Sequence, residues 1–246
     1  MILAWQAPDN LKDRFRWAVG QITPNGSQWV LTYLDGKEFE QANEGRSNER
    51  LRALGFTGYP GFTSDTSTHR EGVMEAFMRR LPPKSRADFQ SYKAHFRLAN
   101  DLELSDLGLL GRTEAKLPSD GFSVVDPLDA PEAQTDELMM EVAGYRYYAQ
   151  NLGRPLEVAQ SLQAVPEPAN LHDQQAIMFM LDDTKIGYVN RLQTGIFHRW
   201  LQQGNIQIAV ERINGTETSP RAFVFVSPVS ALRERSERRA DVSTDA

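Results

Sequence analysis

Residues 165–191 read VPEPANLHDQQAIMFMLDDTKIGYVNR, and this stretch decides how the second half of the chain folds. The proline-bounded loop at its start carries the polar side chains of Asn170, His172 and Asp173. An apolar run over 176–181, an acidic turn at Asp182 and Asp183 and a strand-like segment over 186–189 follow. The order predicts a β-hairpin with polar groups gathered at one end.

The loop before this hairpin admits two interpretations. Asn and Asp are ordinary turn-forming residues, so a turn with no further role accounts for them. Polar residues held between prolines and a buried run are also typical of a binding site on a loop. This stretch alone leaves both interpretations open.

Two further blocks flank the hairpin and complete a recognisable pattern. Upstream lies the aromatic segment Gly144-Tyr-Arg-Tyr-Tyr148, and downstream lies Gly187-Tyr-Val-Asn-Arg191. With Asn170-Leu-His-Asp-Gln-Gln-Ala-Ile177 between them, these blocks resemble the HIRAN domain over about residues 138–230. The family pattern has a proline where this chain has Leu171.

The resemblance implies a mainly β small barrel, related to the OB fold, with one or two helices. It implies binding of single-stranded DNA or DNA 3′ ends, with Tyr147 stacking on a base and Asp173 holding the free 3′-hydroxyl. His172 stands where the family has a second stacking tyrosine, and Tyr188 stands where a histidine can meet phosphate. The predicted DNA-binding residues are Arg146, Tyr147, Tyr148, Asn170, His172, Asp173, Tyr188 and Arg191.

The residue types fit this chemistry, because single strands are held by cations along the backbone and by rings that stack on bases. Arg146 and Arg191 suit phosphates, whereas a carboxylate repels them, so Asp173 indicates an acceptor for a terminal hydroxyl. The alternative is structural. The segment 138–148 is expected to be a strand, and Arg146, Tyr147 and Tyr148 would then fill or fringe the barrel.

Composition narrows the class of protein. The 246 residues carry a net charge of -6, so nucleic-acid binding must be local, and the absence of cysteine removes disulfides and cysteine-ligated zinc. No paired-histidine motif or Ser, His and acid arrangement stands out. We therefore expect no catalytic residues, metal or cofactor. No signal peptide or membrane span is apparent, so a cytoplasmic protein is expected.

The first half reads as an α+β domain over residues 1–127. Strand-like segments at 2–5, 17–22 and 29–34 precede an amphipathic helix over 73–81, which Pro82 and Pro83 end. A basic cluster lies at this helix end: Arg79, Arg80, Lys84 and Arg86. It predicts either a solvated face, where the helix dipole favours cations, or a docking patch.

The helix end Phe77 to Pro82, followed by Leu109-Leu-Gly111 and Asp120-Gly121, resembles the N-terminal subdomain of HipA-type kinase toxins. No kinase core follows. The resemblance implies a partner-binding element that docks a HipA-like kinase. The predicted layout is this domain over 1–127, a linker over 128–136, the HIRAN-like barrel over 137–230 and a charged tail over 231–246. The hypothesis is a non-enzymatic DNA-binding protein; the alternative is an antitoxin-type module that inhibits a kinase without binding DNA.

Overall fold

A computed structural model describes residues 1–8, 11, 13, 15–117, 120–130, 136–204 and 206–228. The chain divides into two compact units, Met1–Pro127 and Leu128–Ala246. Most of the predicted linker and all of the predicted tail over 231–246 lie outside the described residues.

The first unit is built on a five-stranded antiparallel sheet with the order β6-β3-β2-β1-β7. Its strands are β1 (Ile2–Gln6), β2 (Arg16–Asn25), β3 (Gln28–Tyr33), β6 (Thr68–His69) and β7 (Phe122–Val125), and a separate pair joins β4 (Gly58–Tyr59) to β5 (Phe62–Thr63). The strands predicted at 2–5, 17–22 and 29–34 are therefore confirmed. Trp17, Leu3 and Leu31 are completely buried at the centre of this sheet.

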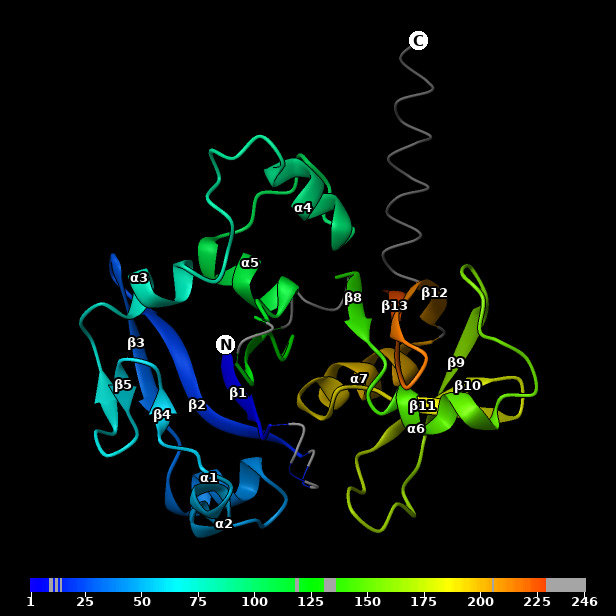
Figure 1. Cartoon of the computed structure of the whole chain (residues 1–246), viewed down its shortest axis with the longest axis horizontal. Coiled ribbons are helices and arrows are strands. Elements are labelled where there is room, and N and C mark those ends of the chain that lie inside the picture. The colour runs from blue at the N-terminus through cyan, green and yellow to red at the C-terminus, as the bar shows by residue number, and fades with distance from the viewer. Residues whose placement is uncertain are drawn as a thin grey trace. The chain divides into compact units, whose positions relative to one another are not determined.

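Short helices complete the first unit: α1 (Gly36–Ala42), α2 (Asn48–Ala53), α3 (Val73–Met78), α4 (Phe89–His95) and α5 (Asp106–Thr113). In Figure 1, α1 and α2 lie together at one end of the sheet, and α4 lies beyond α5 at the other. The helix predicted over 73–81 is α3, and its buried face consists of Val73 and Phe77, with Leu81 just beyond. The side chain of Asp35 accepts a hydrogen bond from Gly36 N and caps α1.

Arg80 corrects the prediction of a basic surface after α3, because its guanidinium is buried. It donates from Nη1 to Asp120 Oδ2 at 2.8 Å and from Nη2 to Asp120 Oδ1 at 3.0 Å. The carbonyls of Ala115 and Phe122 accept two further bonds, at 2.8 and 2.9 Å. Arg80 thus ties the end of α3 to the segments around β7, whereas its neighbour Arg79 is exposed.

The second unit is mostly β, as predicted. Its six-stranded antiparallel sheet has the order β11-β10-β9-β12-β13-β8. The strands are β8 (Leu138–Glu141), β9 (Ser161–Pro166), β10 (Ile177–Leu181), β11 (Thr184–Tyr188), β12 (Ile206–Thr216) and β13 (Ser219–Pro228). The helices are α6 (Tyr145–Tyr148), α7 (Thr194–Gln203) and the 3-10 turns η2 (Ala149–Asn151) and η3 (Arg191–Gln193).

The predicted hairpin at the centre of this unit is confirmed. Ile177, Phe179 and Leu181 of β10 point into the core, as expected for alternating positions of a strand, and Asp182 and Asp183 form the turn. The core is closed by α7, which buries Ile196, Phe197 and Trp200 along one face.

Asn-Gly is a common turn sequence, but Asn214 and Gly215 do not form the turn between β12 and β13. Asn214 pairs with Arg221 and Gly215 pairs with Pro220, so both continue the β12–β13 ladder. The hairpin instead turns after Thr216, which pairs with Ser219. Local turn propensity was overridden here by pairing between two long strands.

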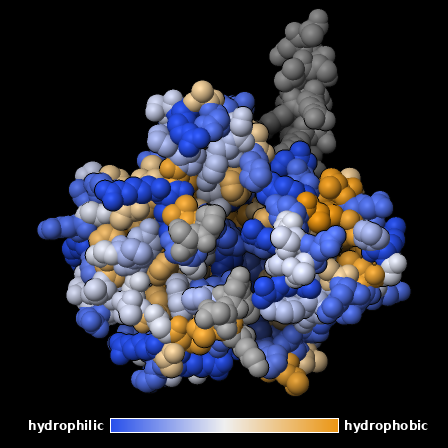
Figure 2. Space-filling model, viewed as in Figure 1, coloured by the Kyte–Doolittle hydropathy of each residue, from blue (hydrophilic) through white to orange (hydrophobic). Residues whose placement is uncertain are grey.

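The surface on the face shown in Figure 2 carries apolar residues in separate patches among polar ones, as is usual for proteins. Among the described residues, no helix is both long and apolar enough to cross a bilayer.

Candidate functional site

The predicted site residues Arg146, Tyr147 and Tyr148 lie on a helical turn, which corrects the strand expected over 138–148. The strand β8 ends at Glu141, and Gly144 then adopts a left-handed conformation with φ 76°. Glycine reaches this conformation without strain, and it starts the turn α6. Of the four residues in α6, only Tyr145 is buried, so its neighbours are available at the surface.

The turn α6 is held against β11 by a bridge between Ala143 and Tyr188. Ala143 N donates to Tyr188 O at 2.8 Å, and Tyr188 N donates to Ala143 O at 2.9 Å. Because β8 and β11 are the two outer strands of the sheet, this bridge joins one edge to the other and curls the sheet. The proximity of α6 and β11 is visible in Figure 1.

Gly187 makes that close approach possible. A Cβ atom at this position would lie 2.5 Å from Val142 Cγ1 and 2.6 Å from Ala143 O, and its φ of 148° disfavours any side chain. The glycine in the Gly-x-Val block is therefore required by the contact between two segments that both carry predicted site residues.

Around this contact, five side chains form a group that we call the Glu167 cluster: Tyr148, Glu167, Asn170, Lys185 and Tyr188. Lys185 Nζ donates to Glu167 Oε1 and to Tyr188 OH, both at 2.7 Å. Tyr188 OH and Asn170 Nδ2 donate to Glu167 Oε2, at 2.9 and 2.5 Å. The ring of Tyr148 meets the ring of Tyr188 edge to face, with centroids 5.9 Å apart.

These contacts fix the charge states in the cluster. The hydrogen bond from Lys185 lowers the pKa of Glu167. Burial is the largest single influence on Lys185 and opposes its charged form, but the contacts with Glu167 and Tyr188 together outweigh burial and raise the pKa of Lys185 to about 12. Burial raises the pKa of Tyr188 to about 12. At neutral pH the cluster therefore contains a carboxylate, an ammonium group and a protonated phenol.

The loop that carries Asn170 and Asp173 is organised by side-chain to backbone bonds. Asn170 Oδ1 accepts from His172 N at 2.9 Å and from Asp173 N at 3.1 Å. Asp173 Oδ1 accepts from Gln175 N at 2.8 Å. Within the described part of the chain, Asp173 Oδ2 and the His172 ring have no partner, so both can reach a ligand.

The other predicted residues lie near these elements. Tyr147 is 52% exposed, and Arg146 Nη2 donates to its hydroxyl at 2.5 Å. The Arg146 guanidinium carbon lies 4.7 Å from the centroid of the same ring. Arg191 begins η3, directly after the buried Asn190 whose side chain caps that turn. The structure thus joins Tyr148, Asn170 and Tyr188 in one cluster and pairs Arg146 with Tyr147.

Sequence reasoning missed Glu167 and Lys185. Residues three apart on a regular strand point to opposite sides, so Lys185 was not expected beside Tyr188. The register of β10 and β11 shifts between Phe179 and Met180, and this bulge places both side chains on one side. The Pro-Glu-Pro sequence was a usable signal for Glu167, because prolines hold a charged residue in a fixed extended loop.

Comparison with known families decides what the second unit is. The model of the HIRAN domain family matches residues 136–229. These residues are a HIRAN domain. The resemblance predicted from the three sequence blocks is thereby confirmed. The match starts at residue 136, and the resemblance of the first unit to HipA-type toxins stays a prediction.

A solved structure is also similar to the chain. The crystal structure of the HIRAN domain of human HLTF is 18% identical, with a TM-score of 0.30, over 42% of this chain and 85% of that one. No curated protein matches the sequence.

Proposed function

We propose that the HIRAN domain binds single-stranded DNA at its 3′ end and that the protein acts without catalysis. The observation that carries this proposal is the free Oδ2 of Asp173 on a loop whose backbone is fixed by Asn170. A carboxylate accepts a hydrogen bond from a hydroxyl but repels a phosphate. The site therefore favours an end that carries a free hydroxyl.

The surrounding side chains supply the other requirements of single-strand binding. Tyr147 offers a half-exposed ring for stacking, and stacking of one base on an aromatic ring contributes about 1–3 kcal/mol. Arg146 lies over that ring and can reach a phosphate beside the stacked base. With a net charge of -6 on the chain, affinity must come from these local contacts.

Asp173→Ala is expected to remove discrimination between strand ends. Wild-type protein should bind a short single strand with a free 3′-hydroxyl about tenfold more tightly than the same strand with a 3′-phosphate, the effect of one charge-assisted hydrogen bond. Fluorescence anisotropy with a label at the 5′ end measures both affinities. In Asp173→Ala the two affinities should become equal.

Tyr147→Ala serves as the matched control for this experiment. Loss of the stacking ring should weaken the binding of both oligonucleotides by about tenfold or more and leave the ratio of the two affinities unchanged. Equal binding of the two strands by the wild-type protein would rule out recognition of the end.

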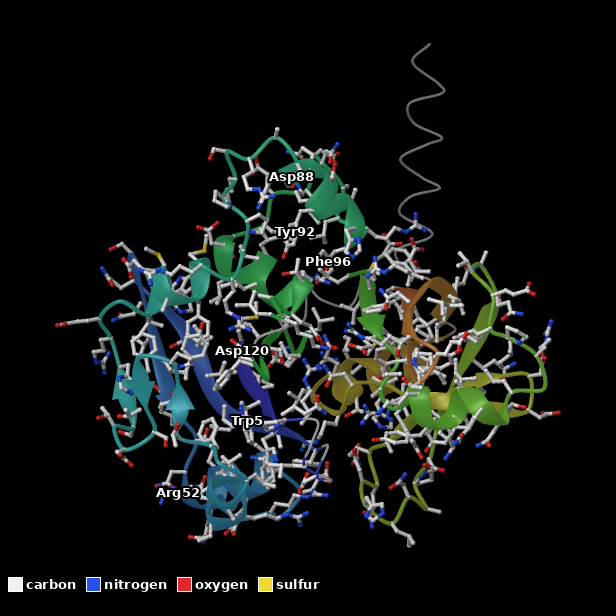
Figure 3. All side chains as sticks on the ribbon, viewed as in Figure 1. Trp5, Arg52, Asp88, Tyr92, Phe96 and Asp120 are labelled. Carbon is white, nitrogen blue, oxygen red and sulfur yellow. The ribbon has the colours of Figure 1, made fainter. Side chains whose placement is uncertain are left out.

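For the first unit we propose that it docks a HipA-like kinase. An open hollow of about 480 Å³ lies at the end of α3, beside the Leu81-Pro82 segment that carries the resemblance, and it supports a docking role. Arg79, Arg86 and Tyr92 are among its lining residues. Figure 3 shows Tyr92 and Phe96 on the side of α4 that faces α5.

Arg79→Glu is the variant that tests docking, because Arg79 is exposed and has no partner among the described residues. Co-expression with a kinase encoded by an adjacent gene should give a complex with the wild-type protein, and the charge reversal should weaken it by about tenfold. If the wild-type protein formed no complex with the kinase and did not relieve its toxicity, this role would be excluded.

A further inference from the structure

The Glu167 carboxylate accepts hydrogen bonds from three residues that come later in the chain, one on the following loop and two on β11. Lys185 Nζ lies 2.7 Å from Oε1, while Tyr188 OH and Asn170 Nδ2 lie 2.9 and 2.5 Å from Oε2. An ammonium group, a phenol and an amide therefore converge on two anionic oxygens. The contacts are partly shielded from water, with the side chains of Lys185 and Glu167 26% and 24% exposed.

This donor set is the kind that proteins use for a backbone phosphate. Phosphate oxygens in nucleic-acid complexes accept from lysine, from tyrosine hydroxyls and from side-chain amides. An ionised carboxylate offers the same acceptors and the same sign of charge. Here those donors are already engaged by the protein's own carboxylate.

We infer that Glu167 is an internal phosphate mimic that occupies a phosphate subsite of the HIRAN domain and lowers its affinity for DNA. The inference rests on the proposed function, because it assumes that a strand reaches the cluster. A strand phosphate that approaches Lys185 must displace the carboxylate and is repelled by it until it does. Glu167 thereby lowers the share of the binding free energy that comes from the DNA backbone, relative to the share that comes from the 3′ end of the strand.

The opposite role for Glu167 predicts the opposite result. If the carboxylate only holds Asn170, Lys185 and Tyr188 in position for DNA, then its loss disorders these donors and weakens binding. If it competes with phosphate, then its loss frees Lys185 and strengthens binding. The sign of the change in affinity separates the two roles.

Glu167→Gln tests the inference, since the amide keeps the size of the side chain and removes its charge. Binding of a single strand with a free 3′-hydroxyl should tighten by about tenfold, the contribution of one charge-assisted contact. The slope of log affinity against log salt should steepen by about 0.7, because one more phosphate is neutralised on a single strand. Glu167→Ala should change both quantities in the same direction.

Asp182→Asn is the matched control, because it removes one negative charge from the hairpin that follows the Glu167 loop and so changes the net charge by the same amount. Asp182 is 80% exposed in its side chain and lies 3.6 Å from Arg154. Asparagine tolerates the left-handed conformation at this position, where φ is 51°. Affinity for DNA should change less than about twofold, as expected for a screened surface charge.

The outcomes distinguish failure of this inference from failure of the proposed function. Suppose that the wild-type protein binds DNA and that both Glu167 variants, shown by circular dichroism to be folded, bind equally well or more weakly. This result would overturn the inference and leave the proposed function standing. If Asp182→Asn tightened binding as much as Glu167→Gln does, net charge alone would explain the effect, and the inference would again be overturned. Absence of binding by the wild-type protein and by every variant would overturn both.

Discussion

Gly187→Ala is expected to destabilise the HIRAN domain by about 3 kcal/mol, the sum of a strained backbone conformation and overpacking. The new methyl group would meet Val142 Cγ1 at 2.5 Å and Ala143 O at 2.6 Å; Val142 is buried, and Ala143 O accepts a hydrogen bond from Tyr188 N. The bridge between Ala143 and Tyr188 would open. Because this bridge brings α6 to β11, DNA binding should weaken together with stability.

Hydrogen exchange measured by mass spectrometry locates this effect. Amides of residues 142–145 and 187–189 should lose protection first, and the urea midpoint of the second unit should fall. Gly195→Ala is the control, since nothing lies within 4 Å of the added Cβ and alanine favours the helix α7. If Gly187→Ala unfolded at the same urea concentration as the wild type, the close approach of Gly187 to Val142 and Ala143 would not contribute to stability.

Arg80→Met is expected to destabilise the first unit by about 3–5 kcal/mol, the usual result of breaking a buried ion pair. Methionine fills the aliphatic space but removes the guanidinium that donates to Asp120 and to the carbonyls of Ala115 and Phe122, and Asp120 keeps the bond from Phe122 N. Asp120 is 22% exposed, so water compensates part of its loss and favours the lower end of that range.

Tryptophan fluorescence reports this change, because Trp5, Trp17 and Trp29 all lie in the first unit. A background of Trp200→Phe removes the signal of the second unit. Arg79→Met is the control: the side chain is exposed, and its replacement should shift stability by less than about 0.5 kcal/mol. Equal midpoints for the two variants would show that the Asp120 pair does not stabilise this unit.

The parts of the fold that follow from local pattern could be predicted. The apolar run of β10, the Asp182-Asp183 turn and the amphipathic face of α3 each depend on residues close together in the chain. The HIRAN resemblance followed from three blocks in a fixed order, because their spacing encodes which segments meet.

The parts that depend on distant contacts could not be predicted. Tyr145 to Tyr148 have strand-forming side chains, but Gly144 in a left-handed conformation starts a helical turn instead. The charge of Arg80 suggests a surface position, and only its pairing with Asp120, 40 residues away, makes burial tolerable. A bulge in the pairing of β10 and β11 places Lys185 on the same side as Tyr188, and the spacing of residues in the sequence does not predict this bulge.

The boundary of the second unit lies earlier in the chain than the family match. The side chain of Leu128 is buried in the core of this unit, and Arg199 donates to the carbonyls of Leu128 and Asp129. A fragment cut at residue 136 would leave a leucine-sized void and two lost acceptors for Arg199. A fragment meant to keep the whole core of the second unit should therefore begin no later than Leu128.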